Sequence, residues 1–204
     1  MIKKIQEIAI FPLNGALLLP NSNLPLNIFE DRYLSMIDYS LASNKHFGMI
    51  QFKNKENKKL YSIGCLGKIT SFNETLDKKY VINLFGTSKF EIIKEITTEK
   101  SFRIFNVEII DNKNYYDLSK SFDRKSLIAN VRYYFQKIKV DIDWNYMEKI
   151  NNEELINAIA VICPFENNEK QMLLESKNIN DLGDKLIAIL EFNNNKTNTN
   201  ESIN

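Results

Sequence analysis

The chain has 204 residues, with 27 basic against 26 acidic side chains and a formal net charge of +1. Hydrophobic residues make up 44% and charged residues 26%, as in ordinary globular proteins, so fibrous, disulfide-scaffold and wholly disordered classes are excluded. The near-zero charge argues against a dedicated nucleic-acid binder and against a polybasic membrane anchor, because both carry a basic excess.

Short strands and turns are predicted at the start of the chain. Gln6 to Phe11 is rich in β-forming residues and ends at Pro12, with the turn signal Asn14-Gly15 directly after it. A second strand is predicted over Leu24 to Ile28. Pro25 inside it marks an edge strand or a bulge, because proline has no N–H to donate to a neighbouring strand.

A single helix then interrupts the strands, over about residues 30–42. Six mostly apolar residues recur at helical spacing and line one face: Phe29, Tyr33, Met36, Ile37, Ser40 and Leu41. Glu30 and Asp31 at its start suit the positive end of the helix dipole. Phe29, Tyr33 and Met36 are predicted to close one end of a small barrel.

Further strands follow the helix, predicted over residues 47–52, 63–72, 80–85, 90–96 and 102–110. Gly64 and Gly67 lie within one of them, where a glycine marks a bulge or a close approach of another backbone. Gly86-Thr87-Ser88 is predicted to separate two others. Many short strands with one helix indicate a small barrel or sandwich.

From about residue 118 the hydrophobic period changes from two to 3.6, which predicts helices. One carries the stripe from Leu127 to Ile138, a second spans Asn152 to Cys163, a third opens at Asn168, and a fourth is capped by Asp181. The prediction is therefore an α+β protein with a β subdomain over 1–115, a helical bundle over 116–192 and a disordered tail over 193–204.

The residues that usually carry chemistry are sparse. Cys65 and Cys163 have no second ligand at metal-binding spacing, and His46 is the only histidine. Gly67-Lys68 does not complete a phosphate-binding loop. We therefore predict no catalytic residue, no metal, no cofactor and no bound nucleotide.

The N-terminal segment and the cysteines predict a cytoplasmic location. Lys3 and Lys4 before an apolar stretch resemble a short secretory signal, but Glu7 and Pro12 interrupt it, and a strand is the favoured interpretation. Two unpaired thiols suit a reducing compartment. No apolar run reaches the length of a membrane span, so no membrane contact is predicted.

Three blocks of the sequence resemble the substrate-binding domain at the N-terminus of Lon proteases. They are Ile10-Phe11-Pro12-Leu13 with Leu19-Pro20, Leu24-Pro25-Leu26 and Ile28 to Met36; Gly64 to Ile69 with Leu84-Phe85-Gly86 and Phe90; and Cys163-Pro164-Phe165 with Glu169 to Gln171 and Leu173 to Glu175. They occur in the family's order over roughly residues 6 to 191. Two departures are Lys89, where the family has arginine, and Asp184-Lys185-Leu186, where it often has Glu-Arg-Leu.

The resemblance implies a PUA-like β-barrel or sandwich with one embedded helix, followed by a C-terminal helical bundle. It also implies a non-catalytic function, the binding of unfolded polypeptides or protein partners in protein quality control. The missing phosphate-binding loop indicates a stand-alone form without the ATPase and protease domains of full-length Lon. Candidate partner-binding residues lie in the first block: Glu30, Arg32, Tyr33, Phe11 and Leu13. The competing interpretation gives Glu30 and Arg32 structural roles.

Two other functions remain open. PUA-like barrels can bind RNA, and the lysines of residues 53–59 together with Lys78 and Lys79 form the candidate patch, although the neutral chain argues against it. A peptidase with an unrecognised Ser-Lys pair is the other alternative. The sequence gives no indication of the oligomeric state.

Overall fold

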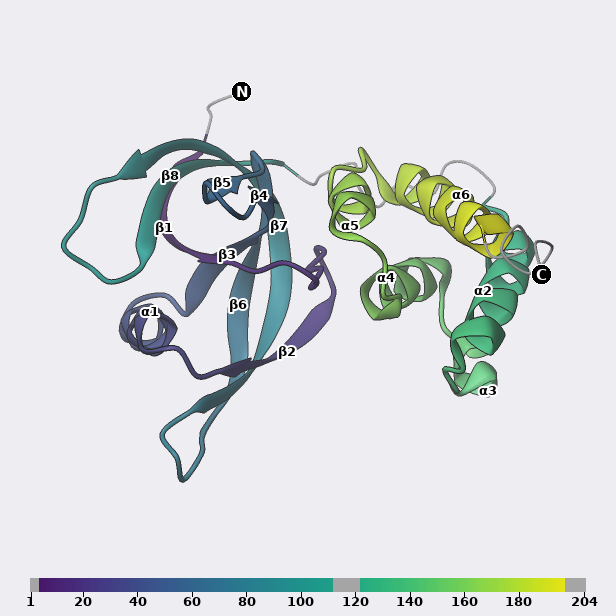
Figure 1. Cartoon of the computed structure of the whole chain (residues 1–204), viewed down its shortest axis with the longest axis horizontal. Coiled ribbons are helices and arrows are strands. Elements are labelled where there is room, and N and C mark those ends of the chain that lie inside the picture. Colours follow the sequence, from purple (N-terminus) through teal and green to yellow (C-terminus); the bar gives the residue numbers. More distant parts are fainter. Residues whose placement is uncertain (1–3, 112–121, 197–204) are drawn as a thin grey trace. The chain divides into compact units, whose positions relative to one another are not determined.

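The computed structural model describes residues 4–111 and 122–196, and the chain divides into two compact units, Met1–Asn112 and Lys113–Asn204. The first unit holds the strands and helix α1 (Asp31–Ala42), and the second holds α2 to α6 (Figure 1). The predicted α+β class, a β-barrel followed by a helical bundle, is confirmed.

The first unit is built from eight strands among the described residues, and their bounds are β1 Ile5–Pro12, β2 Asn23–Ile28, β3 His46–Ile50, β4 Phe52–Asn54, β5 Lys59–Leu60, β6 Ile63–Glu74, β7 Tyr80–Ile96 and β8 Arg103–Ile109. Six of them form one sheet in the order β2-β7-β6-β3-β1-β8. Since β7 also pairs with β8, five strands close into a barrel and β2 is attached to it through β7 alone. The remaining two, β4 and β5, form a hairpin.

Strand β7 is longer than predicted, because Gly86-Thr87-Ser88 does not interrupt it. It runs for 17 residues, pairing with β2 over its first part and with β8 over its last part. Opposite Gly86 the register with β6 shifts between Leu66 and Gly67, so a bulge absorbs the glycine segment. This bend lets one strand serve both the barrel and β2.

The barrel is filled by fully buried apolar side chains, among them Phe47, Phe90, Ile10, Ile82 and Leu84. A Cβ on Gly64 would lie 2.3 Å from the Phe90 ring and 2.6 Å from the Met49 carbonyl oxygen. The predicted close approach at Gly64 is therefore confirmed.

Helix α1 packs on β1 and β3 with Tyr33, Met36, Ile37 and Ser40 buried, as its periodicity predicts. Phe29 is the exception: its side chain is 64% exposed, so the expectation that it closes the barrel is wrong. Phe29 precedes the first helical residue and follows the last residue of β2, so the helical period does not fix its direction.

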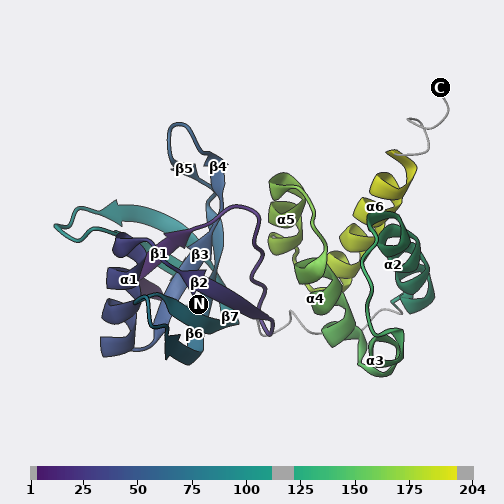
Figure 2. The same ribbon diagram turned by 60° about the horizontal axis from the view of Figure 1, so that its bottom comes forward.

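The second unit contains α2 (Arg124–Ile138), α3 (Trp144–Lys149), α4 (Asn152–Ile162), α5 (Asn167–Leu174) and α6 (Ile179–Lys196). Helix α6 contacts α2, α4 and α5, and Figure 2 shows it running beside α2. Short polar caps start three of the helices: the side chains of Asp123, Asp143 and Asn151 each accept a hydrogen bond from a backbone N–H three residues later.

Four points of the helix prediction need correction. Helix α3 has too few residues to show a hydrophobic period and was not predicted. Helix α5 begins before Asn168, with the N–H of Glu166 donating to Glu169 Oε2 at 2.8 Å, and Asn178 rather than Asp181 caps α6 through the Asp181 N–H. Helix α6 continues to Lys196, so a tail beginning at 193 starts too early, and residues 197–204 lie outside the described part.

Candidate functional site

The predicted partner-binding residues divide between the core and the surface. Phe11 is 6% and Tyr33 is 7% exposed, and their rings meet edge to face at 4.4 Å between centroids. Leu13 is half-buried and its N–H donates to the Ile50 carbonyl at 2.9 Å. Phe11 and Tyr33 therefore fix α1 against the barrel, and Glu30 and Arg32 alone of the five stand at the surface.

Glu30 and Arg32 form an ion pair at 2.7 Å, although residues two apart on a helix do not face each other. The pair forms because Glu30 is not helical: its φ of −82° and ψ of 131° place it at the N-cap, where its side chain makes no capping bond. The Arg32 guanidinium in turn lies 4.5 Å from the Tyr33 ring centroid. Arg32 therefore contacts both Glu30 and Tyr33 at the start of α1.

We expect Glu30→Gln to change the free energy of unfolding by no more than about 0.5 kcal/mol, because both members of the ion pair are near half exposed and solvent screens them. Thermal melting of the variant beside the unchanged chain measures this. A large fall in melting temperature would show that Glu30 holds the helix start in a way that this ion pair does not explain.

A second surface feature lies at the free end of the β6–β7 hairpin, next to β2. Four exposed apolar side chains lie at this end of the sheet, which we call the hairpin surface: Phe29, Phe72, Leu76 and Val81. Register pairs Phe72 with Ile82 and Val81 with Asn73, so Phe72 and Val81 point to opposite faces of the hairpin, and Leu76 lies in the turn between the strands. Figure 1 shows this hairpin extending away from the barrel past α1.

The hairpin surface is held in place by aromatic and polar contacts. The Phe72 and Tyr80 rings lie 4.8 Å apart, and the Tyr80 hydroxyl donates to Asp38 of α1 at 2.8 Å. That hydrogen bond to a carboxylate is the main reason that the pKa of Tyr80 is raised. The Tyr80–Asp38 hydrogen bond thus connects the β6–β7 hairpin to α1, the helix on which the sequence placed candidate binding residues.

Sequence reasoning did not find Phe72, Leu76 or Val81 as candidate residues. A signal was present at the turn, where Leu76 is the only apolar residue between Thr75 and Lys79. Thr75 and Lys79 bond to each other across the turn, so the polar residues satisfy the backbone and the leucine side chain projects outward, fully exposed.

The lysines proposed as an RNA-binding patch do not share one surface. Residues 53–59 form the β4–β5 hairpin, whereas Lys78 and Lys79 lie in the turn after β6. The 12 residues of β6 separate the two groups, which is roughly 40 Å at about 3.3 Å per residue. Figure 1 shows the β4–β5 hairpin and the free end of the β6–β7 hairpin at opposite ends of the barrel. Lys79 also pairs with Asp77 at 2.5 Å.

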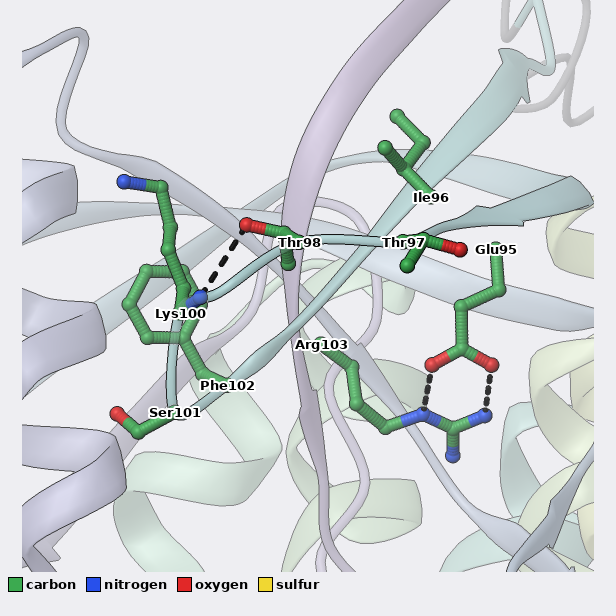
Figure 3. A pocket seen from close by; sticks show the side chains of 8 residues that line it. All are labelled: Glu95, Ile96, Thr97, Thr98, Lys100, Ser101, Phe102 and Arg103. Atoms are coloured by element: carbon green, nitrogen blue, oxygen red, sulfur yellow. Dashed lines mark hydrogen bonds and ion pairs between the residues drawn. The ribbon is translucent and has the colours of Figure 1, made fainter.

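An open pocket of about 420 Å³ lies at the β7–β8 connection, lined by residues from Glu95 to Arg103 (Figure 3). Its most basic group is already engaged, because two nitrogens of Arg103 donate to the two carboxylate oxygens of Glu95 at 2.7 Å each. Lys100 lies over the Tyr39 ring at 4.6 Å. The pocket therefore offers no prepared site for an anion.

The Arg103 hydrogen bonds hold the pKa of Glu95 below its ordinary value. A carboxyl of this kind stabilises the fold above its unfolded-state pKa, and the contribution is lost as the pH falls through its folded-state pKa. We expect Glu95→Gln to be less stable than the unchanged chain at pH 7, with the difference shrinking below the ordinary glutamate value of about 4.3. Urea unfolding at several pH values measures this; a difference independent of pH would contradict it.

The described residues offer few groups for nucleophilic or metal-dependent chemistry. Cys65 and Cys163 are both buried free thiols, and burial raises the pKa of Cys163 to about 12 and that of Cys65 further. Residues 4–111 and 122–196 hold no group of three or more His, Cys, Asp or Glu side chains placed to bind a metal ion. In the same ranges, no helix combines the length and hydrophobicity that crossing a bilayer requires.

Comparison with known proteins identifies the family to which this chain belongs. Residues 7–191 match the model of the ATP-dependent protease La (LON) substrate-binding domain. The Lon protease of Buchnera aphidicola subsp. Acyrthosiphon pisum is 27% identical over 193 residues, covering 90% of this chain and 25% of that protein. The Lon protease of Dictyoglomus thermophilum is 23% identical, covering 86% of this chain and 23% of its own length. The chain thus spans about a quarter of these relatives.

Two solved structures share the fold. The Lon N-terminal domain protein from Xanthomonas campestris superposes with a TM-score of 0.64 at 17% identity, covering 90% of this chain and 98% of the other. The N-terminal domain of the Mycobacterium avium complex Lon protease gives a TM-score of 0.63 at 14% identity, covering 91% and 98%.

Proposed function

Because the chain belongs to the family of Lon substrate-binding domains, we propose that it is a non-catalytic protein that binds unfolded polypeptides in protein quality control, in the cytoplasm. The observation that carries this proposal is the hairpin surface. Its four apolar side chains are from 40% to 108% exposed, and its most exposed member, Leu76, stands at the tip of a projecting hairpin.

Exposed apolar groups on a supported hairpin suit weak, broad recognition of unfolded chains. Burying one leucine side chain stabilises a complex by about 1.5–3 kcal/mol, and unfolded segments offer apolar groups that folded proteins keep inside. The hairpin surface requires no fixed charge on its ligand. Many different unfolded chains therefore satisfy it.

A binding role is also supported by the chemistry of the described residues. The thiols are buried and protonated, and the pocket arginine is occupied by Glu95. The separation of the lysine groups along β6 gives no continuous basic surface for RNA. Polypeptide binding is the function that these features favour.

We expect Leu76→Ser to weaken binding of an unfolded protein by about tenfold, because the serine removes the leucine burial described above. The probe is fluorescently labelled, reduced and carboxymethylated α-lactalbumin, titrated in an anisotropy assay, with native α-lactalbumin as the ligand control. The matched control variant is Ile93→Ser, which removes a 53% exposed apolar side chain from β7 away from the hairpin tip. Equal loss in both variants, or binding of native α-lactalbumin, would contradict the proposal.

A further inference from the structure

Strand β2 has a free edge within residues 4–111, because β7 is its only sheet neighbour there. The register fixes which backbone groups point to that edge. Gly86 donates its N–H to the Ser22 carbonyl and accepts from the Asn21 N–H, both at 2.9 Å, so Gly86 directs its backbone toward the β2 side.

The alternating direction of backbone groups along β7 then shows which neighbouring strand each of its other residues faces. In an antiparallel pair, successive residues point their N–H and C=O groups to opposite neighbours. The even-numbered residues from Tyr80 to Gly86 therefore face β2, and the odd-numbered ones face β6. The Thr75 N–H agrees independently, since it donates to the carbonyl of odd-numbered Lys79 at 2.8 Å.

The partners of the even-numbered β7 residues are Leu24, Leu26 and Ile28, so their backbone groups are used within the sheet. The backbone groups of Asn23, Pro25 and Asn27 point away from β7, and these three residues are exposed. The outer edge thus presents three carbonyls, at Asn23, Pro25 and Asn27, and two N–H donors. Pro25 fits this assignment, because proline is tolerated in a sheet where its missing N–H would face outward.

The side chains of β2 leave this edge open to another chain. Edge strands are commonly protected by charged side chains or by proline; β2 has no charged side chain in its sequence Asn-Leu-Pro-Leu-Asn-Ile, and Pro25 removes one of the outward N–H groups and leaves those of Asn23 and Asn27. Leu24 and Leu26 lie on one face of the strand and the two asparagines on the other. A strand added here would place alternate side chains beside the leucines and beside the asparagines.

We propose that the outer edge of β2 binds an extended, uncharged polypeptide segment as an additional strand, with alternating apolar and polar side chains. This rests on the proposed function and specifies how the polypeptide is held. Outward groups two residues apart recur about every 7 Å, the spacing of the N–H groups along one edge of an extended backbone. The hairpin surface, with Phe29 directly after β2, continues the same binding region.

The first test changes the backbone of β2 in the full chain. Asn27→Pro removes the outward N–H and places a ring at the edge, whereas Asn27→Ala removes the same side chain and keeps the N–H. Against an acetylated and amidated heptapeptide of alternating threonine and valine, we expect Asn27→Pro to weaken binding about tenfold and Asn27→Ala to leave it nearly unchanged. Equal effects in the two variants would overturn the proposal.

A second variant, expected to bind the peptide more tightly, tests the proposal even if Asn27→Pro fails to fold. Pro25→Ala restores a donor at the centre of the edge, and one added hydrogen bond is expected to tighten peptide binding about two- to tenfold. The same heptapeptide with N-methyl groups on its edge-facing residues should bind none of the variants. Unchanged affinity in Pro25→Ala would count against strand addition.

Amide hydrogen exchange of the full chain, followed by NMR, locates the bound peptide. Saturating heptapeptide should slow exchange at Asn23 and Asn27. If unfolded α-lactalbumin binds but these two amides show no protection from the heptapeptide, strand addition is wrong and the proposed function stands; if α-lactalbumin also fails to bind, the proposed function fails too. If the two amides are already protected without peptide, the proposal is overturned. Protection that does not depend on protein concentration would show that this chain itself covers the edge, and protection that rises with protein concentration would show that a second copy covers it.

Discussion

Gly86→Ala is expected to destabilise the first unit by about 3–5 kcal/mol, one of the largest effects a single methyl group can have. A Cβ at this position would lie 2.0 Å from the Leu19 carbonyl oxygen and 2.8 Å from the Leu19 carbonyl carbon. Both are backbone atoms, so no rotamer change relieves the overlap. The loop before β2 would have to move, and with it the hydrogen bonds that the Gly86 N–H donates to the Ser22 carbonyl and that the Gly86 carbonyl accepts from the Asn21 N–H.

Urea unfolding followed by hydrogen exchange of peptides from β6 and β7 measures this loss. The control is Gly15→Ala, where φ is +82° and no atom lies within 4 Å of the new methyl group. That substitution carries only the cost of a left-handed backbone, about 1 kcal/mol. A loss in Gly86→Ala no larger than in Gly15→Ala would show that the loop before β2 adjusts freely.

Phe90→Ala is expected to cost a similar amount, about 3–5 kcal/mol. Its ring is fully buried and occupies the space that glycines leave: a Cβ on Gly48 or Gly64 would lie 2.8 Å or 2.3 Å from it. Removing the ring leaves a cavity bordered by strands whose hydrogen bonding prevents collapse. Larger side chains at the two glycines would be needed to fill it.

Phe29→Ala is the matched control, because the same side chain there is 64% exposed and its removal leaves no cavity. We expect its free energy of unfolding to change by about 0.5 kcal/mol or less. Chemical denaturation of the two variants under one set of conditions compares them. Similar losses would contradict the assignment of Phe90 to the core.

Local signals predicted several elements correctly. Helical spacing predicted the buried stripe on α1, β-forming residues ending at Pro12 predicted β1, and Pro25 marks β2 as an edge strand. Gly86-Thr87-Ser88 misled the prediction because its local preference for a turn is overridden by pairing on both sides of β7. Such pairing depends on residues far away in the sequence.

The candidate site was less predictable than the fold. Phe11 and Tyr33 belong to the sequence block that resembles the family, and the structure uses them to pack α1 on the barrel, so this block identified core residues. Leu76 belongs to no period, and only the closed turn around it shows that its side chain projects. Exposure of single apolar residues is a tertiary property, and sequence patterns report it poorly.

Photo-crosslinking tests most directly whether the hairpin surface contacts unfolded polypeptide. A benzoylphenylalanine replaces Leu76 in one variant and Ile93 in another, and each is irradiated with reduced, carboxymethylated α-lactalbumin or with the native protein. The predicted result is a crosslink from position 76 to the unfolded chain, with none to native α-lactalbumin and none from position 93. Crosslinks of equal yield from both positions, or none from position 76 while binding persists, would contradict a polypeptide-binding role for the hairpin surface.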